Sequence, residues 1–214
     1  MNAMKSTLLI AVALSCVSAV TSVADSTKFV APAFRGQPNA DFAGWEVFTV
    51  PTGANNPDVA GSDAVATLAQ TSAGAMLVGG GNIYAGPFAI GAFSVSYDVS
   101  SPLATVVFQV RTLGLEPNYN SISLNYGSGT LTAARTELER ATDNSMPGSM
   151  AVTSSWTWDL TGVNATALTI NLGATTPHVV LDAAQLDVAA VPEPETWAMI
   201  SGVGLLAFAV WRRR

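Results

Sequence analysis

The residue types that carry most enzyme chemistry are scarce in this 214-residue sequence. His178 is the only histidine, and no Gly-x-Ser-x-Gly turn supplies a nucleophile beside it, so a catalytic triad is not predicted. The number of available ligands also excludes a typical zinc site. Glu137 and Glu139 could form the carboxylate pair that a glycosidase needs. The neighbouring Arg135 and Arg140 instead favour a solvated charged surface, and we expect no catalytic residues and no enzyme activity.

Trp156 and Trp158 are the residues best suited to contact a glycan. They lie two positions apart, so in a β-strand both rings point to the same face. On an exposed face they would form a platform for stacking sugar rings, and on an inner face they would belong to the core. The large area that tryptophan buries favours the core, and the turn residues at 159–162 place Trp158 near the packed end of its sheet. The glycan platform is the alternative.

The most informative pattern lies in the last part of the sequence. It consists of Pro192-Glu193-Pro194, an uncharged apolar stretch at residues 197–211, and Arg212, Arg213 and Arg214. As a helix with a rise of about 1.5 Å per residue, the stretch spans roughly 22 Å, less than the ~30 Å of a hydrocarbon core. Tryptophans at both of its ends and long arginine side chains favour a membrane position nonetheless. We predict a transmembrane helix at 197–211, with the arginines in the cytoplasm and all preceding residues outside.

This order of tripeptide, apolar helix and basic tail resembles the PEP-CTERM sorting signal, over residues 191–214. In that family a membrane-embedded exosortase recognises the signal and is thought to cleave near the Pro-Glu-Pro. Its members typically come from Gram-negative bacteria that make exopolysaccharide and grow in biofilms. The resemblance implies that Pro192, Glu193 and Pro194 are the recognition element. The helix with Arg212 to Arg214 would hold the precursor in the membrane.

The N-terminal residues have the pattern of a secretory signal peptide. Lys5 precedes an apolar run at residues 8–14, and small residues follow up to Ala24. We expect cleavage between Ala24 and Asp25, so that residues 1–24 are removed. The only cysteine, Cys16, would leave with this segment. The mature chain would then have no disulfide, no thiolate metal site and no cysteine nucleophile.

Residues 25–190 form one predicted domain, which is acidic and rich in β-strand patterns. From position 25 to 191 there are five basic and thirteen acidic residues, which argues against nucleic acid as a partner. Runs of β-branched or alternating residues predict strands at 45–50, 64–70, 92–98, 105–113, 121–126, 151–158, 167–172 and 179–188. Only residues 133–141 could form a short helix. The expected fold is all-β, an antiparallel jelly-roll-like sandwich.

Two edges of this domain loosely resemble carbohydrate-binding jelly rolls of the galactose-binding-like type. They are residues 39–46 and residues 178–188. In that family a structural calcium often lies between the first and last strands, and by position Asp182 would supply a carboxylate to it. The alternative is an aspartate that caps a turn or faces solvent. No other metal and no organic cofactor is expected.

The sequence thus predicts an exported protein, first anchored in the inner membrane and then released to the cell surface or the extracellular space. Its expected partners are an exosortase and extracellular polysaccharide. The principal hypothesis is a non-catalytic surface or matrix protein associated with exopolysaccharide or biofilm. The alternatives are a carbohydrate-binding module with a defined glycan site and a hydrolase whose site has no visible motif.

Overall fold

The computed structural model describes most of the domain between the two terminal segments. The described residues are 26–59, 66–71, 73–86, 92–143, 148–173 and 177–192, with single residues at 202, 205, 208, 211 and 212. The predicted signal peptide, with Ala24 and Asp25 at its cleavage site, lies outside them, as does most of the predicted helix at 197–211. Within the described part of the chain, no helix is both long enough and apolar enough to cross a membrane.

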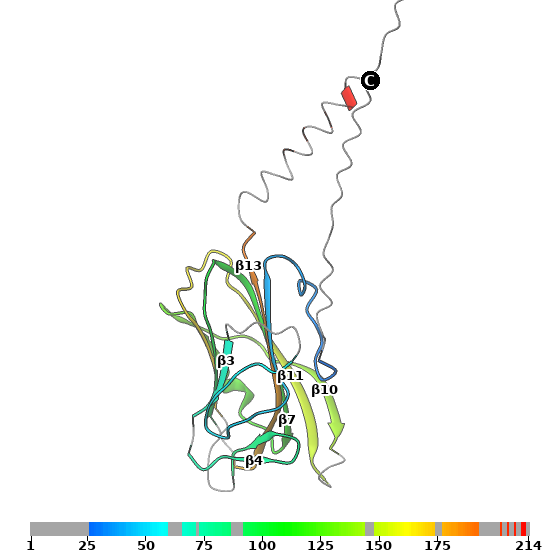
Figure 1. Cartoon of the computed structure of the whole chain (residues 1–214), viewed down its shortest axis with the longest axis vertical. Coiled ribbons are helices and arrows are strands. Elements are labelled where there is room, and N and C mark those ends of the chain that lie inside the picture. The colour runs from blue at the N-terminus through cyan, green and yellow to red at the C-terminus, as the bar shows by residue number, and fades with distance from the viewer. Residues whose placement is uncertain are drawn as a thin grey trace, which may run out of the picture.

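The described strands form two antiparallel sheets. The first, sheet A, has the order β10-β11-β7-β13-β5-β4, and β1 also pairs with β13. Its strands are β1 Ala40–Trp45, β4 Met76–Val78, β5 Asn82–Tyr84, β7 Leu103–Gly114, β10 Thr136–Thr142, β11 Met150–Asp159 and β13 Val179–Ala190. β13 is central, because β7 pairs with it on one side and β1 and β5 share the other side (Figure 1).

The second sheet, sheet B, has the order β2-β3-β6-β12-β8-β9. Its strands are β2 Gly53–Asn55, β3 Ala66–Gln70, β6 Ala92–Tyr97, β8 Ser123–Asn125, β9 Thr130–Leu131 and β12 Leu168–Gly173. A 3-10 turn, η1 (Tyr119–Ser121), precedes β8. Side chains alternate between buried and more exposed positions along β3, β6 and β12, as expected for strands with one face on a core.

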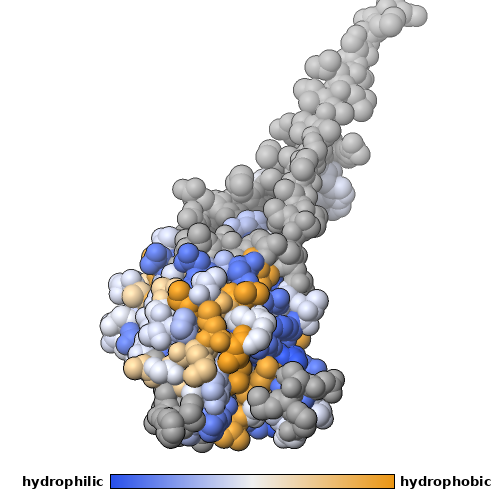
Figure 2. Space-filling model, turned by 60° about the horizontal axis from the view of Figure 1, so that its bottom comes forward, coloured by the Kyte–Doolittle hydropathy of each residue, from blue (hydrophilic) through white to orange (hydrophobic). Residues whose placement is uncertain are grey.

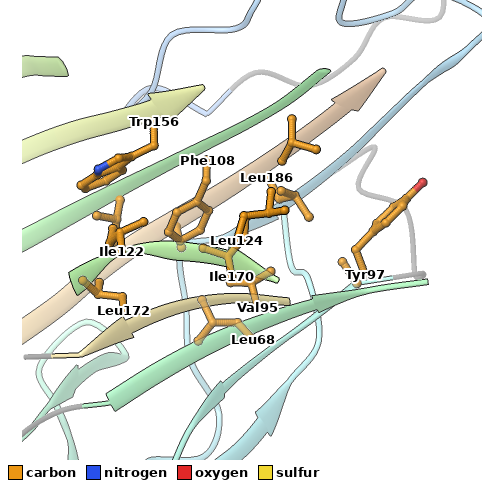
Figure 3. Packing of buried hydrophobic residues seen from close by; sticks show 14 of the residues in the cluster. Leu68, Val95, Tyr97, Phe108, Ile122, Leu124, Trp156, Ile170, Leu172 and Leu186 are labelled. Carbon is orange, nitrogen blue, oxygen red and sulfur yellow. The ribbon is translucent and has the colours of Figure 1, made fainter. Parts of the chain in front are cut away.

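The core lies between the two sheets. Figure 3 shows Trp156, Phe108 and Leu186 of sheet A facing Leu124, Ile170, Val95 and Leu68 of sheet B. All of these side chains are buried, so the packing is that of a β-sandwich. The predicted all-β class and antiparallel pairing are therefore confirmed for the described residues.

Seven of the eight predicted strands are present with small differences at their ends, but the prediction of a helix at 133–141 is wrong. β10 covers most of this stretch and pairs with β11, from Thr136 opposite Ser155 to Thr142 opposite Met150. The alternation of charged residues in this stretch suits an exposed edge strand equally well. Charged side chains also protect such an edge from pairing with another chain.

The first predicted strand, at 45–50, is displaced toward the N-terminus and ends at Trp45. Side chains take over the backbone hydrogen bonds of the residues that follow. Asp58 accepts from the backbone N–H groups of Glu46 and Val47 at 2.7 and 2.9 Å. The side-chain oxygen of the buried Asn55 accepts from the backbone N–H groups of Thr49 and Val50 at 2.8 and 3.0 Å. These local bonds compete with strand pairing despite the β-branched composition.

Residues 26–39, here called the N-terminal strap, lie across the outer face of sheet A. The side-chain amide of Gln109 on β7 binds both backbone groups of Val30, donating at 2.7 Å and accepting at 3.2 Å. Lys28 Nζ lies 3.2 Å from Asp182 Oδ2 on β13. The strap thereby covers polar side chains on the outer face of β7 and β13 that would otherwise be solvated, and Gln109 is only 1% exposed.

The surface mixes polar and apolar regions. Figure 2, which brings the lower end of the domain in Figure 1 forward, shows apolar side chains in a band that runs down the middle of the view, bordered by polar ones. The edge strand β4, labelled at this end in Figure 1, has Met76 46% and Leu77 39% exposed.

Candidate functional site

The residues of the predicted sorting signal begin where the central strand β13 ends. The last residue of β13, Ala190, is held by Asn39, the last residue of the strap. Ala190 N–H donates to the Asn39 carbonyl at 2.8 Å, and Asn39 Nδ2 donates to the Ala190 carbonyl at 2.5 Å. Val191 N–H then donates to the carbonyl of Pro102 at 2.8 Å. The chain is thus bound on both sides up to Val191, and Pro192 is exposed.

Proline chemistry explains why the ladder stops here. Pro192 has no N–H to donate, so β13 cannot continue through it, and it restricts Val191 to an extended backbone. Of the other sorting residues, Arg212 is helical and exposed. Glu193, Pro194, Arg213 and Arg214 lie outside the described residues. The structure therefore shows where the hydrogen-bonded part of the chain ends, which is at Val191, directly before the first proline of the motif.

The comparisons with known proteins agree with this location. The family model of the PEP-CTERM protein-sorting motif matches residues 190–214. This match indicates an exported protein that an exosortase processes. No curated protein and no solved structure matches the chain. The loose resemblance of the domain to galactose-binding-like jelly rolls is thus supported by no match.

The two tryptophans proposed as glycan contacts are core residues. Trp156 is 1% and Trp158 2% exposed. Trp156 packs against Phe108 and Tyr119, with ring centroids 6.4 and 6.0 Å apart. A sugar cannot stack on rings with so little exposed surface, so these positions offer no glycan platform in this structure. In β11 both tryptophans point to the inner face of the sheet, as expected from the large area that a tryptophan side chain buries.

Asp182, the predicted calcium ligand, lies between two cations. Its Oδ2 is 3.2 Å from Lys28 Nζ and 3.2 Å from Arg111 Nε, and Arg111 Nη1 also lies 2.9 Å from Glu139. Calcium needs six to eight oxygen ligands, and positive neighbours oppose it. Within the described part of the chain, no group of three His, Cys, Asp or Glu residues could hold a metal ion. Asp182 is also not a turn cap, because it lies within β13 and pairs with cations on two other segments, the strap and β7.

Glu137 and Glu139 are both held by arginines. Glu137 binds Arg135 at 2.9 Å and Arg140 at 2.8 Å, and the hydrogen bond from Arg140 is the main reason why its pKa is lowered. Glu116 completes the cluster and has a lowered pKa, again chiefly through a hydrogen bond from Arg140. A glycosidase acid needs a raised pKa. The cluster is therefore suited to structure rather than to proton transfer.

His178 lies in the turn before β13 and is exposed. Its Nδ1 shares a hydrogen bond with the hydroxyl of Tyr84, and the two rings lie 5.9 Å apart. The backbone of His178 has a φ of 66°, which is uncommon for a residue other than glycine. A triad also needs a carboxylate that orients the histidine, and Tyr84 does not supply one, so this contact by itself does not assemble a triad.

Sequence reasoning missed the residues that join the two ends of the domain. Arg35 of the strap binds Asp187 of β13 through Nε and Nη2, at 2.6 and 2.7 Å, and both side chains are buried. Asn39 binds Ala190 across a separation of 151 positions. The only local signal was the presence of three polar residues within a strand otherwise made of apolar and small residues. They are Asp182, Gln185 and Asp187 of β13.

Proposed function

We propose that this chain is a non-catalytic surface or extracellular-matrix protein, sorted by an exosortase and associated with exopolysaccharide or biofilm. In this proposal the precursor is held in the inner membrane through residues 197–211 and the arginines at 212–214. Exosortase cleavage then releases the β-sandwich to the cell surface or the extracellular space. The observation that carries the proposal is the sorting-motif match, which begins at the last residue of the folded domain's central strand.

The domain's chemistry supports a role without catalysis. Its exposed carboxylates at 116, 137 and 139 are engaged by arginines. The acidic, Gly-, Ser- and Thr-rich domain also suits a hydrated extracellular matrix better than an anionic membrane surface. No calcium or other cofactor enters the proposed function.

Processing is tested in a host that carries the matching exosortase. Intact-mass spectrometry of the exported pool should show a mature protein that ends near Pro194. Glu193→Ala, or deletion of residues 212–214, should leave a larger, membrane-held form. An exported protein that still ends at Arg214 would refute the proposed sorting.

The association with polysaccharide is tested separately, by binding of the processed protein to the host's own exopolysaccharide and to a glycan array. Weak binding to the bulk polymer supports the matrix role. Saturable binding to one defined glycan would instead favour the alternative, a carbohydrate-binding module. The ring pair of the half-buried Tyr84 and the exposed His178 is the described feature that could serve such a module, since tyrosine and histidine present both a ring face and polar atoms.

A further inference from the structure

The sorting signal follows the folded sheet with almost no spacer. Val191 is the only residue between the end of β13 at Ala190 and the first proline of the motif, Pro192. Val191 itself is still hydrogen-bonded to Pro102. Figure 1 shows β13 beside β1 at the end of the domain from which the chain leaves. An enzyme that acts near Pro194 therefore works two or three residues from a closed hydrogen-bond network.

This network, here called the exit clamp, consists of Asn39, Pro102, Ala190 and Val191. Three hydrogen bonds close it: two between Asn39 and Ala190, and one from Val191 to Pro102. The adjacent register supports it, with Ala40 opposite Ala189 in β1 and Leu103 opposite Ala190 in β7. The backbone of residues 189 and 190 is consequently fixed on both edges, and Val191 is fixed on the β7 side through Pro102.

An enzyme that cleaves a peptide bond binds several extended residues ahead of that bond through their backbone groups, as in β-strand addition. For a bond near Pro194, those residues include Val191 and reach toward Ala190. Their N–H and C=O groups are the ones that the exit clamp uses. The clamp and the enzyme compete for the same backbone.

We propose that the exit clamp gates this cleavage and that Asn39 is a positioning residue for the cleavage; this proposal rests on the proposed exosortase processing. The exosortase acts on a minor state in which Ala190 and Val191 have left the sheet. When such opening is faster than cleavage, the rate follows the equilibrium population of the open state. The clamp thus slows processing, and after cleavage it closes again over Val191 and keeps the end of β13 in the sheet.

The test measures the processing rate of the full chain in the host with the matching exosortase, by pulse-chase labelling and intact mass. Asn39→Ala keeps the backbone carbonyl but removes the Nδ2 bond to Ala190, and one hydrogen bond corresponds to about a two- to tenfold change in an equilibrium constant. We expect processing to accelerate by that factor. Amide hydrogen exchange at Ala190 and Val191 should accelerate equally, which a general loss of stability elsewhere in the domain would not produce.

The matched control is Asn125→Ala, which removes a bond from a turn in sheet B, where Asn125 Oδ1 accepts from Gly127 N–H at 2.8 Å. It should leave the processing rate unchanged. An insertion of eight Gly and Ser residues between Val191 and Pro192 should accelerate processing more than Asn39→Ala does, because the enzyme then needs no clamp residue. Combining Asn39→Ala with the insertion should add nothing further.

An Asn39→Ala variant processed at the wild-type rate, or more slowly, would overturn the gate, as would an insertion that brings no acceleration. Both outcomes are read as ratios to wild type. Failure of the proposed function has a different signature, in which the wild-type chain itself is not cleaved and every variant keeps Arg214.

Discussion

The ion pair between Arg35 and Asp187 should be the most costly single contact to remove from the strap. The guanidinium binds the carboxylate with two hydrogen bonds, and the two side chains are 5% and 0% exposed. Gln185 donates a further bond to Asp187 at 3.1 Å, and the guanidinium lies 4.0 Å from the ring centroid of Phe42. Arg35→Ala would leave the carboxylate buried without its cation. Breaking a buried pair in this way costs about 3–5 kcal/mol.

The assay is thermal and guanidinium unfolding of residues 25–192, followed by circular dichroism. For a domain of this size, each kcal/mol corresponds to roughly 2–4 °C, so Arg35→Ala should lower the melting temperature by about 6–20 °C. Lys28→Ala is the matched control on the same strap. Its partner Asp182 is shared with Arg111 and Lys28 is 28% exposed, so the loss should be about 1 kcal/mol or less.

A second variant separates the charge from the packing. Arg35→Met combined with Asp187→Leu removes both charges and keeps apolar volume, and such replacements of buried ion pairs are often neutral or stabilising. The double variant should therefore recover most of the loss. The reasoning fails if Arg35→Ala costs no more than Lys28→Ala, because the strap would then not depend on the buried pair.

Three further predictions concern the domain itself. Trp156→Ala and Trp158→Ala should each cost about 3–5 kcal/mol in denaturant unfolding, through lost burial and cavity formation. A loss of less than 1 kcal/mol at both sites would contradict their core position. Chelation with EDTA should leave the melting temperature unchanged, because Asp182 faces two cations; a fall that Asp182→Ala abolishes would restore the calcium hypothesis. Finally, the lowered pKa of Glu137 means that the unfolded state binds more protons near the ordinary value of 4.5. Its contribution is present above that pH and is lost as the pH falls through the folded-state pKa, and Arg140→Gln should reduce the acid sensitivity of the melting temperature.

The regular strands could be predicted from the sequence because their signals are local. Strands such as β7 and β12 alternate or carry β-branched runs between turn residues, and the core they form follows from the period of two. The sorting motif was also local, since its tripeptide, apolar stretch and basic tail are contiguous. The displacement of the strand expected at 45–50 came where side chains compete with backbone pairing, as Asp58 and Asn55 do after Trp45. The wrong helix at 133–141 came from an alternation of charged residues that suits an exposed edge strand equally well.

The ion pairs and the exit clamp could not be predicted, because they join positions far apart in the chain. Asp182 was interpreted as a calcium ligand, from its position in the resemblance to jelly rolls, or as an aspartate that caps a turn or faces solvent. Its actual partners, Lys28 and Arg111, are brought to it by the strap and by β7. Asn39 had a loop-like local context, and its function as a contact of Ala190 depends on the register of β1 against β13.

The strap connects the stability of the domain to the proposed gate. Along the strap, Lys28, Arg35 and Asn39 contact β13 in order at Asp182, Asp187 and Ala190, so the strap follows β13 toward the exit of the chain. Asn39 lies between Arg35 and β1, so a change that lifts the strap removes the support of Asn39 on one side, while the pairing of β1 with β13 supports it on the other. The free energy that holds the strap down is then part of the free energy that keeps the exit clamp closed. In the proposed mechanism, the buried ion pair thus limits the rate of cleavage without contact with the sorting motif.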